Sequence, residues 1–368
     1  MIVVAKIGTS SITDDHGAVD QAAVRKLCAE VADLRRASHA VVVVSSGAIA
    51  AGQPALGMSP VGLSAGRPSD LATLQALSAV GQSRLMRVYD DTLATHGLVA
   101  GQVLLAPLDF VHRKQYLHAR QTITRLLQLG VVPVVNENDA VADDEIRFGD
   151  NDRLAGLVAH LVGADVLVLL TDAPGLLTGD PRLVQDASLV EEIVTVDQEM
   201  ERAAGGAGTL RGSGGMASKL AAAKMAAWSG VRVVIAAASR PDVLAGAVAA
   251  EPGVGTVVRP HDRRLPARKL WIAFAVGASG TVVVDDGARA ALVERNRSLL
   301  PAGVVAVEGS FEAEDAVEIA DASGRVVAKG LVRHPAGRVK EWAGKRTADL
   351  PPDLPHEVVH RDDLVVLA

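Results

Sequence analysis

The sequence predicts an α/β protein with a mostly parallel sheet covered by helices on both faces, followed by a small β-rich domain. Through the first two-thirds of the chain, short and nearly all-apolar runs alternate with longer segments of helical period. Strands buried on both faces give such runs, and their alternation with helices indicates a parallel sheet. Towards the C-terminus the alternation stops, and short runs separated by glycines indicate a β-barrel or sandwich.

The first strand and the first long helix are the clearest elements. Ile2–Ile7 is predicted as a buried strand, and Ala22–Arg36 as a helix with Asp20 placed to cap it. The helix places Cys28 on its apolar face, so this cysteine is more typical of a small core hydrophobe than of a reactive thiol. That face comprises Val24, Leu27, Cys28, Val31 and Leu34.

The same reasoning predicts the other elements of the large domain. Further strands are expected at Val41–Val44, Leu98–Leu105, Val131–Val135, Val166–Leu170 and Val231–Ala236. Helices are expected at Leu71–Leu93, Gln115–Leu129, Arg153–Leu161 and Ala217–Trp228.

The domain boundary is predicted from a change of composition. Residues 259–276 contain two prolines and five basic residues near their start, and we interpret them as a linker between domains 1–258 and 277–368. In the second domain, short strands are expected at Thr281–Val284, Val304–Val307, Ala316–Ile319, Arg325–Val327 and Leu364–Val366.

Composition excludes several classes of protein. Hydrophobic residues make up 49% of the 368 residues but aromatic residues only 2%, so aliphatic side chains must build the core. A net charge of −6 gives no reason to expect binding to nucleic acid or to an anionic membrane. One cysteine cannot form an intramolecular disulfide, no apolar run is long enough for a bilayer, and the N-terminus lacks the pattern of a signal peptide. We therefore expect a cytoplasmic protein.

Two strands end in small, hydroxyl-bearing turns. Lys6 lies in a buried strand just before Gly8-Thr9-Ser10, and Ser45-Ser46-Gly47 follows the second strand. An unpaired lysine in a strand is costly, which favours a position at the strand end where an anion can meet it. The alternatives are a solvated lysine and a simple turn, but two such turns on neighbouring strands indicate more than either alone.

Polar clusters follow two further strands. Asn136-Glu137-Asn138-Asp139 comes after the fourth strand, and Gly149-Asp150-Asn151-Asp152 precedes a helix. They either bind something polar or cap and turn the chain, as Asp150 or Asn151 could at the helix start. Thr171-Asp172 ends another strand, where Asp172 is either a ligand-binding or a turn residue.

A glycine-dense segment, Gly205 to Lys219, leads into a helix. Backbone N–H groups at a helix N-terminus, with Ser213, Ser218 and Lys219, form a suitable phosphate cradle. The segment is neither a Walker A loop nor a dinucleotide fingerprint. A glycine-rich stretch is weak evidence by itself, and a flexible surface loop is the alternative. The sequence has no His/Cys cluster with metal-ligand spacing and no nucleophile elbow. Lysines, glycine turns and carboxylates without a base–nucleophile pair suit phosphoryl transfer to an acceptor that is already ionised, such as a carboxylate.

Taken in order, these segments resemble the amino-acid-kinase family, in particular its members that phosphorylate glutamate. The remainder of the chain resembles a PUA domain. The motifs that carry the resemblance are KIGTS (6–10), SSGAIAAG (45–52), AVGQSRLM (79–86), VVPVVNENDAV (131–141), FGDNDRLA (148–155), LLTDAPGL (169–176) and SGGMASK (213–219).

The resemblance implies that ATP phosphorylates the side-chain carboxylate of L-glutamate, as the first step of proline biosynthesis. It further implies Mg²⁺ held through the nucleotide, feedback inhibition by proline, a homo-oligomer and coupling to glutamyl phosphate reductase. Lys6 and Lys219 would act on the transferring phosphoryl group, with Asp150 and Asp152 organising the site. Ser46, Asp139 and Asn151 would bind glutamate, and ATP would be bound by Lys6, Gly8, Thr9, Ser10, Thr171, Asp172, Ser213, Gly214, Gly215, Met216, Ala217, Ser218 and Lys219.

Two alternatives remain open at this point. A sister kinase for acetylglutamate, aspartate or a nucleoside monophosphate would share the fold and the ATP site. An RNA-binding protein is the other, because PUA domains elsewhere bind RNA. Residues 278–368 carry 11 Lys+Arg and 15 Asp+Glu, a net of −4, which disfavours RNA.

Overall fold

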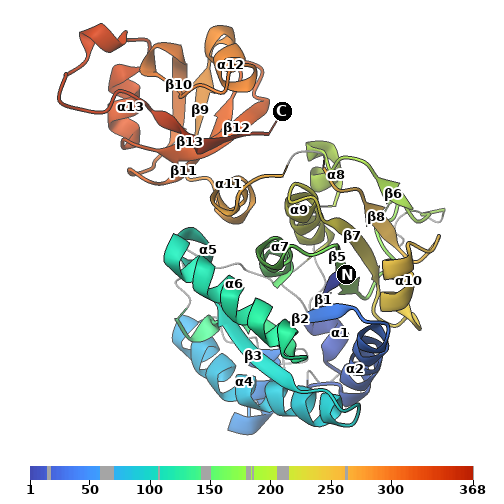
Figure 1. Cartoon of the computed structure of the whole chain (residues 1–368). Coiled ribbons are helices and arrows are strands. Elements are labelled where there is room, and N and C mark those ends of the chain that lie inside the picture. Colours follow the sequence, from blue (N-terminus) through green and yellow to red (C-terminus); the bar gives the residue numbers. More distant parts are fainter. Residues whose placement is uncertain are drawn as a thin grey trace. The chain divides into compact units, whose positions relative to one another are not determined.

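The computed structural model describes residues 1–14, 18–58, 70–106, 108–141, 151–179, 184, 186–204, 215–261 and 264–367. Contacts divide the chain into two compact units, Met1–Leu265 and Pro266–Ala368 (Figure 1). The stretch expected as a linker therefore contributes to both units. No helix in the described ranges combines the length and the apolarity needed to cross a membrane.

The first unit contains a mostly parallel sheet, as predicted. Within the described residues its strand order is β3-β4-β2-β1-β5-β7-β8-β6, and the β7–β8 pair is antiparallel. The other pairs are parallel, so the carboxyl ends of the central strands meet at one edge. The strands are β1 (Ile2–Ile7), β2 (Ala40–Ser45), β3 (Ala100–Leu105), β4 (Val132–Glu137), β5 (Val166–Thr171), β6 (Glu192–Ile193), β7 (Arg232–Ala237) and β8 (Thr256–Val258).

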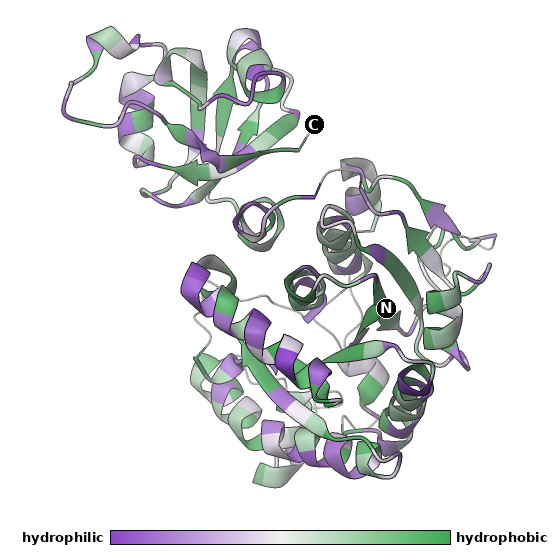
Figure 2. Cartoon of the chain, viewed as in Figure 1, coloured by the Kyte–Doolittle hydropathy of each residue, from purple (hydrophilic) through white to green (hydrophobic). Residues whose placement is uncertain are grey.

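Helices cover both faces of this sheet. On one face α2 packs against α4 and α10, and on the other α7 packs against α6 and α9. Figure 2 shows the central strands as hydrophobic and the outer side of α6 as largely hydrophilic. The helices are α1 (Thr9–Ile12), α2 (Gln21–Arg36), α3 (Ala48–Gly52), α4 (Leu71–Ala94), α5 (Leu108–Val111), α6 (Arg113–Gln128), α7 (Asn151–Val162), α8 (Gln198–Ala203), α9 (Met216–Ala227) and α10 (Val243–Ala249), with short 3₁₀ turns η1 (Pro54–Leu56) and η2 (Asp139–Val141).

The long helices begin and end close to their predicted limits. The Asp20 carboxylate caps α2 by accepting from the N–H groups of Ala22 and Ala23, at 2.7 and 3.2 Å. Cys28 is buried in the core between α2 and the sheet. This position confirms Cys28 as a core hydrophobe, and burial raises the pKa of its thiol to about 12.

Helices α3 and α4 cross at very short range because glycines lie at the contact. A Cβ on Gly81 would lie 1.8 Å from the Ala48 carbonyl oxygen, and a Cβ on Gly52 would lie 2.1 Å from the Leu77 carbonyl oxygen. Helix α3 follows directly from β2 through Gly47, which has the left-handed φ of 97° that glycine accepts at no steric cost. The crossing therefore fixes the turn that carries Ser46.

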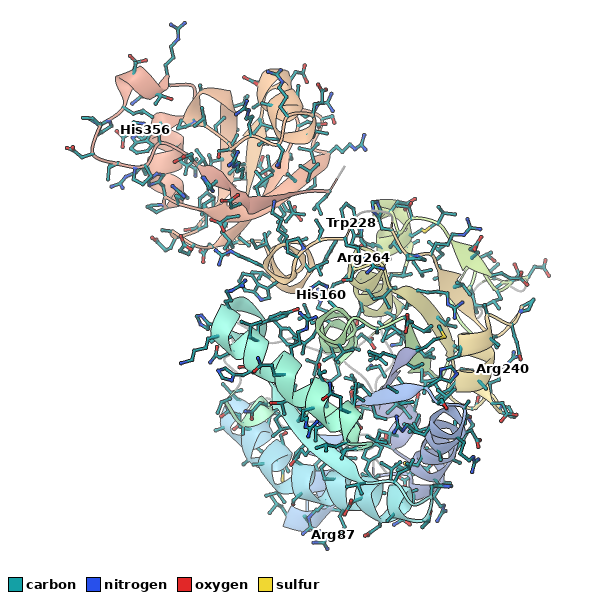
Figure 3. All side chains as sticks on the ribbon, viewed as in Figure 1. Arg87, His160, Trp228, Arg240, Arg264 and His356 are labelled. Carbon is teal, nitrogen blue, oxygen red and sulfur yellow. The ribbon has the colours of Figure 1, made fainter. Side chains whose placement is uncertain are left out.

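The first unit ends by folding back on the end of α9. The ring of His261 stacks on Trp228 at 4.3 Å, and the Leu265 N–H donates to the Trp228 carbonyl at 3.0 Å. Arg264 lies against Gly230, so close that a Cβ there would be 2.4 Å from the Arg264 Nε, and Figure 3 shows Arg264 beside Trp228. These contacts explain why the first unit extends beyond β8.

The second unit is β-rich, as expected. Within its described residues the strand order is β10-β9-β11-β12-β13, with β9 and β11 parallel and the other pairs antiparallel. Aliphatic side chains and Phe311 form its hydrophobic core. Its elements are α11 (Ala267–Leu270), the π-helix η3 (Trp271–Ala275), β9 (Gly280–Val284), α12 (Asp286–Val293), η4 (Pro301–Gly303), β10 (Val304–Gly309), β11 (Ala316–Ala320), β12 (Val326–Val332), α13 (Ala336–Trp342), η5 (Thr347–Asp349) and β13 (Val359–Val366).

Candidate active site

Lys6 lies near the carboxyl end of the central strand β1 and is buried. Successive strand residues point to opposite faces, and Ala5 and Ile7 belong to the core that faces α2. Lys6 therefore projects to the α7 face, where its ammonium pairs with Asp152. A Cβ on Gly8 would lie 3.3 Å from the Lys6 Nζ, so glycine at this turn leaves room beside the ammonium.

Asp152 joins two lysines from different elements. Its Oδ1 pairs with Lys6, and its Oδ2 accepts from Lys219 Nζ at 3.2 Å and from Ser218 Oγ at 3.0 Å. The carboxylate is fully buried and the side chains of both lysines are at most 7% exposed. Burial raises the pKa of Asp152, but Lys6 and Lys219 outweigh it and hold this pKa below its ordinary value. Asp152 therefore remains ionised and holds two cations at the same edge of the sheet.

The N-terminus of α9 brings the end of the glycine-dense segment to this cluster. Gly215 is the N-cap and has no side chain with which to cap the helix. The backbone N–H groups of the first turn, which includes Met216, Ala217 and Ser218, carry the positive end of the helix dipole. An anion at this end would meet those groups beside Lys219.

A separate polar network lies at the ends of β2 and β4. The Asn151 Nδ2 donates to the Ser45 carbonyl at 2.7 Å, to Asn136 Oδ1 at 2.7 Å and to Ser46 Oγ at 3.1 Å. Asn151 is thus the first residue of α7 with its side chain directed to two strands, rather than capping the helix. The network fixes Ser46 relative to Asn151.

Helix α4 supports both strand ends from one face. Its Gln82 Oε1 accepts from Asn136 Nδ2 at 3.0 Å, and its Ser78 Oγ donates to Asp139 Oδ2 at 2.8 Å. Its Tyr89 hydroxyl lies 2.8 Å from Ser45 Oγ. Because Ser45 Oγ donates to the Ser46 carbonyl, Tyr89 is the donor to Ser45, and burial raises the pKa of Tyr89 and keeps it protonated.

The other predicted nucleotide residues lie at the ends of β1 and β5. Thr171 is buried and donates to the exposed Asp172 at 3.0 Å. A cavity of about 510 Å³ opens beside them on the α2 face of the sheet. Its lining includes Ser10 of α1, Thr171, Asp172 and Lys26 of α2. Thr9 and Ser10 form the start of α1, directly after Gly8.

The structure brings six of the predicted site residues into two groups. Lys6, Asp152, Ser218 and Lys219 form the ionic group, and Ser46 and Asn151 belong to the amide network. Asp150, Ser213 and Gly214 lie outside the described residues. Sequence reasoning placed Asn136 in a polar cluster that either binds a ligand or caps the chain, but it missed Ser78, Gln82 and Tyr89 as parts of the site. A signal was present, since Ser78, Gln82, Leu85 and Tyr89 recur at helical spacing and place polar groups on a buried face.

The described carboxylates do not form a ready metal site. No group of three His, Cys, Asp or Glu residues in the described ranges could hold a metal ion. Both oxygens of Asp152 are engaged by lysine ammonium groups, which leaves them unsuited to a divalent cation. These residues fit a Mg²⁺ that arrives on nucleotide phosphates rather than one held by a protein cage.

Comparison with known proteins identifies relatives along the whole chain. Residues 1–237 match the amino acid kinase family, and residues 280–351 match the PUA domain. The glutamate 5-kinase of Pelobacter propionicus is 43% identical over 369 residues, which cover 99% of this chain and 97% of that one. The glutamate 5-kinase of Rhodococcus jostii is 46% identical over 365 residues, covering 99% and 96% respectively. Among solved structures, isopentenyl phosphate kinase of T. acidophilum is similar with a TM-score of 0.47 and 19% identity, over 70% of this chain and 100% of that one.

Proposed function

The chain belongs to the amino acid kinase family, and on that premise we propose that it transfers the γ-phosphoryl group of ATP to the side-chain carboxylate of L-glutamate. The observation that carries the proposal is the pair of buried lysines held on Asp152 at the carboxyl edge of the sheet. The nearly full-length similarity to glutamate 5-kinases supports the choice of acceptor.

The two lysines supply what phosphoryl transfer most needs. Negative charge spreads over the equatorial oxygens of the transferring group in the transition state, and fixed cations stabilise it. A lysine ammonium has three N–H donors, and a hydrogen bond to Asp152 uses only one of those of Lys6 or Lys219. Asp152 keeps both ammonium groups in place before ATP arrives and reduces their mutual repulsion.

The acceptor needs no general base, because a carboxylate is ionised at neutral pH. One of its oxygens forms the new O–P bond while the bond to the ADP oxygen breaks, and the products are L-glutamyl 5-phosphate and ADP. His160 lies at the other end of α7, and burial together with Arg120 lowers its pKa to about 4. It is neutral at physiological pH and has no part in this scheme.

We assign ATP binding to the turn after β1, the end of β5 and the N-terminus of α9. The turn contributes Gly8, Thr9 and Ser10, the strand end contributes Thr171 and Asp172, and α9 contributes its first-turn N–H groups with Lys219. Ser213 and Gly214 complete the proposed ATP-binding set, and we assign to Asp150, with Asp152, the role of organising the site. A Mg²⁺ bound to the nucleotide would neutralise phosphate charge in this site.

We assign glutamate binding to Ser46, Asp139 and Asn151. Asp139 offers a carboxylate to the substrate ammonium and is oriented by Ser78. The wider proposal is a cytoplasmic homo-oligomer that begins proline biosynthesis, is inhibited by proline and couples to glutamyl phosphate reductase. The similarity to glutamate 5-kinases supports this wider proposal.

The test is ATP-dependent formation of acyl phosphate, trapped as the hydroxamate. L-glutamate, N-acetyl-L-glutamate, L-aspartate and no acceptor are run side by side with Mg²⁺, each with and without proline. We expect product from L-glutamate and suppression by proline. Product from a different acid alone would keep the fold and ATP site but reject the acceptor, and no product from any acid would reject the proposed reaction.

A further inference from the structure

The Asn151 side-chain amide donates both of its hydrogen atoms to acceptors within the protein. A side-chain amide nitrogen carries two hydrogens, and the Asn151 Nδ2 has two acceptors at 2.7 Å, the Ser45 carbonyl and Asn136 Oδ1. The third neighbour, Ser46 Oγ, lies farther away at 3.1 Å. Within the part of the chain that the structure describes, the polar atom that Asn151 has left for a ligand is therefore its carbonyl oxygen, which can accept a hydrogen bond but cannot donate one.

The orientation of Asn151 depends in turn on Asn136. The Asn136 Oδ1 accepts from Asn151 Nδ2 and from the Glu137 backbone N–H at 2.8 Å, while its Nδ2 donates to Gln82 Oε1 at 3.0 Å. If the Asn136 amide were turned over, its NH₂ group would face two donors and both bonds would be lost. The Glu137 N–H on one side and the Gln82 oxygen on the other together select the observed orientation.

All three amides are buried, so water cannot replace a lost partner cheaply. Asn136 is 2% exposed, and Gln82 and Asn151 are 7% exposed. A buried polar group left without its partner is destabilising, because it has lost its hydrogen bond to water and gained none in the protein. The chain from Gln82 through Asn136 to Asn151 therefore has one strongly preferred arrangement.

We infer that Gln82 is a positioning residue for acceptor specificity: through Asn136 it sets the Asn151 amide so that Asn151 offers the substrate an oxygen acceptor. This inference rests on the proposed function, in which Asn151 contacts the amino acid. In the proposed glutamate site, an acceptor oxygen on Asn151 acts with the Asp139 carboxylate to attract a free ammonium group and offers nothing to the carbonyl of an N-acyl group. Gln82 would thus favour an amino acid over its N-acylated derivative without touching either.

The test uses two substitutions at position 82 in the full chain. Gln82→Met keeps the length of the side chain and removes the acceptor, whereas Gln82→Glu keeps an oxygen facing Asn136. We measure kcat and KM for L-glutamate, KM for ATP, and kcat/KM for N-acetyl-L-glutamate. Thr92→Val is the matched control, because it removes one hydrogen bond, to the Val88 carbonyl, farther along the same helix.

The expected result is a larger change in KM for L-glutamate than in KM for ATP. Gln82→Met should raise KM for L-glutamate about tenfold, the equivalent of one lost hydrogen bond, and leave KM for ATP within about twofold. The ratio of kcat/KM for L-glutamate to kcat/KM for N-acetyl-L-glutamate should fall by a similar factor. Gln82→Glu should restore most of the affinity for glutamate, and Thr92→Val should behave like wild type.

Other outcomes would overturn the inference. Unchanged glutamate KM in Gln82→Met, or equal increases in KM for glutamate and ATP, would reduce Gln82 to a structural residue. If Gln82→Met does not fold, Gln82→Asn withdraws the oxygen by one methylene and must raise glutamate KM alone for the inference to stand. A wild-type enzyme inactive on glutamate would reject the proposed function together with this inference, whereas an active wild type with an unaffected variant rejects the inference alone.

Discussion

The two groups of site residues are built from different chemistry, although consecutive residues of α7 begin them. Asp152 holds an ionic cluster with Lys6 and Lys219, whereas Asn151 belongs to a network of neutral amides and hydroxyls. Successive helix residues point about 100° apart, so one helix start serves both groups. The first group suits a ligand whose charge is large and changes during reaction, and the second suits a ligand that must be recognised by orientation.

The two groups are held in place by different interactions. The ionic cluster is held by attraction between opposite buried charges, which tolerates small shifts in geometry. The amide network depends on which atom of each amide faces its neighbour, and so on the packing of α4 against β2 and β4. Substitutions in the ionic group should therefore lower kcat, whereas substitutions in the amide network should raise KM for the acceptor.

The largest effect is expected from Lys219→Ala, which removes one cation from the ionic group. We expect kcat to fall by about 10²–10³-fold, as for the loss of one electrostatic donor in other active sites, with a far smaller change in KM for glutamate. Lys224→Ala on the same helix is the control, because Lys224 pairs with Glu201 at 3.2 Å and belongs to neither group. Steady-state kinetics check this, and wild-type turnover in Lys219→Ala would remove Lys219 from the mechanism.

The next effect is expected from Gly81→Ala, which adds a methyl group where α4 meets α3. The Cβ would lie 1.8 Å from the Ala48 carbonyl oxygen, so the helices must separate and the turn at Ser46 must move. We expect a loss of about 3 kcal/mol in the free energy of unfolding, at the upper end for overpacking, and a raised KM for glutamate. Denaturant unfolding measures the first quantity and the hydroxamate assay the second.

Gly337→Ala provides the matched control, because Gly337 also lies within a helix but a Cβ there meets nothing within 4 Å. Alanine is the better helix former, so this variant should be neutral or more stable by up to about 1 kcal/mol. If both variants behave alike, the close helix crossing does not hold the acceptor side in place.

Most of the fold could be predicted from the sequence because the pattern is local. The run Ile2–Ile7 forms β1 with the predicted limits, and the helix expected at Ala22–Arg36 begins one residue earlier behind its Asp20 cap. Elements with a weak pattern were not predicted: β6 has two residues, and α3 is a five-residue helix stabilised by glycine contacts with a distant helix. Those contacts cannot be inferred from the period of one segment.

The two site groups differ in the same way. Lys6 could be proposed because a charged residue in an apolar strand requires a partner. Lys219 could be proposed from the glycine-dense segment that leads into a helix N-terminus, and the role of Asp152 from the resemblance to the family. Gln82 was hidden because the partner of its oxygen, Asn136, is 54 positions away and the bond exists only once α4 packs on β4. Polar residues on the buried face of α4 indicate that hydrogen-bond partners exist, but they do not indicate which residues those partners are.

A smaller effect is expected from Asp139→Asn, which tests the acceptor side with a change of charge. Asparagine can still meet Ser78, but it loses the full attraction for a substrate ammonium. We expect KM for L-glutamate to rise about tenfold, with kcat and KM for ATP within about threefold of wild type. Asp90→Asn, at an exposed position of α4, controls for the change in net charge. An equal loss of kcat would place Asp139 in the ionic group instead.

The smallest effect is the pH dependence that Asp152 gives to stability. The lysines hold the pKa of Asp152 below its ordinary value of 3.8 despite the opposing effect of burial, so the unfolded chain takes up its proton first as the pH falls. The stabilisation is therefore complete well above pH 3.8 and is lost progressively below it, towards the folded pKa. We expect Asp152→Asn to be less stable than wild type at pH 7. Below pH 3.8 the difference in the free energy of unfolding should shrink by at most about 1.4 kcal/mol per pH unit, which is the limit set by one proton. Denaturant unfolding of both proteins across this range measures the difference. A gap that stays constant through the acid range would mean that attraction to the two lysines does not hold the ionic group together.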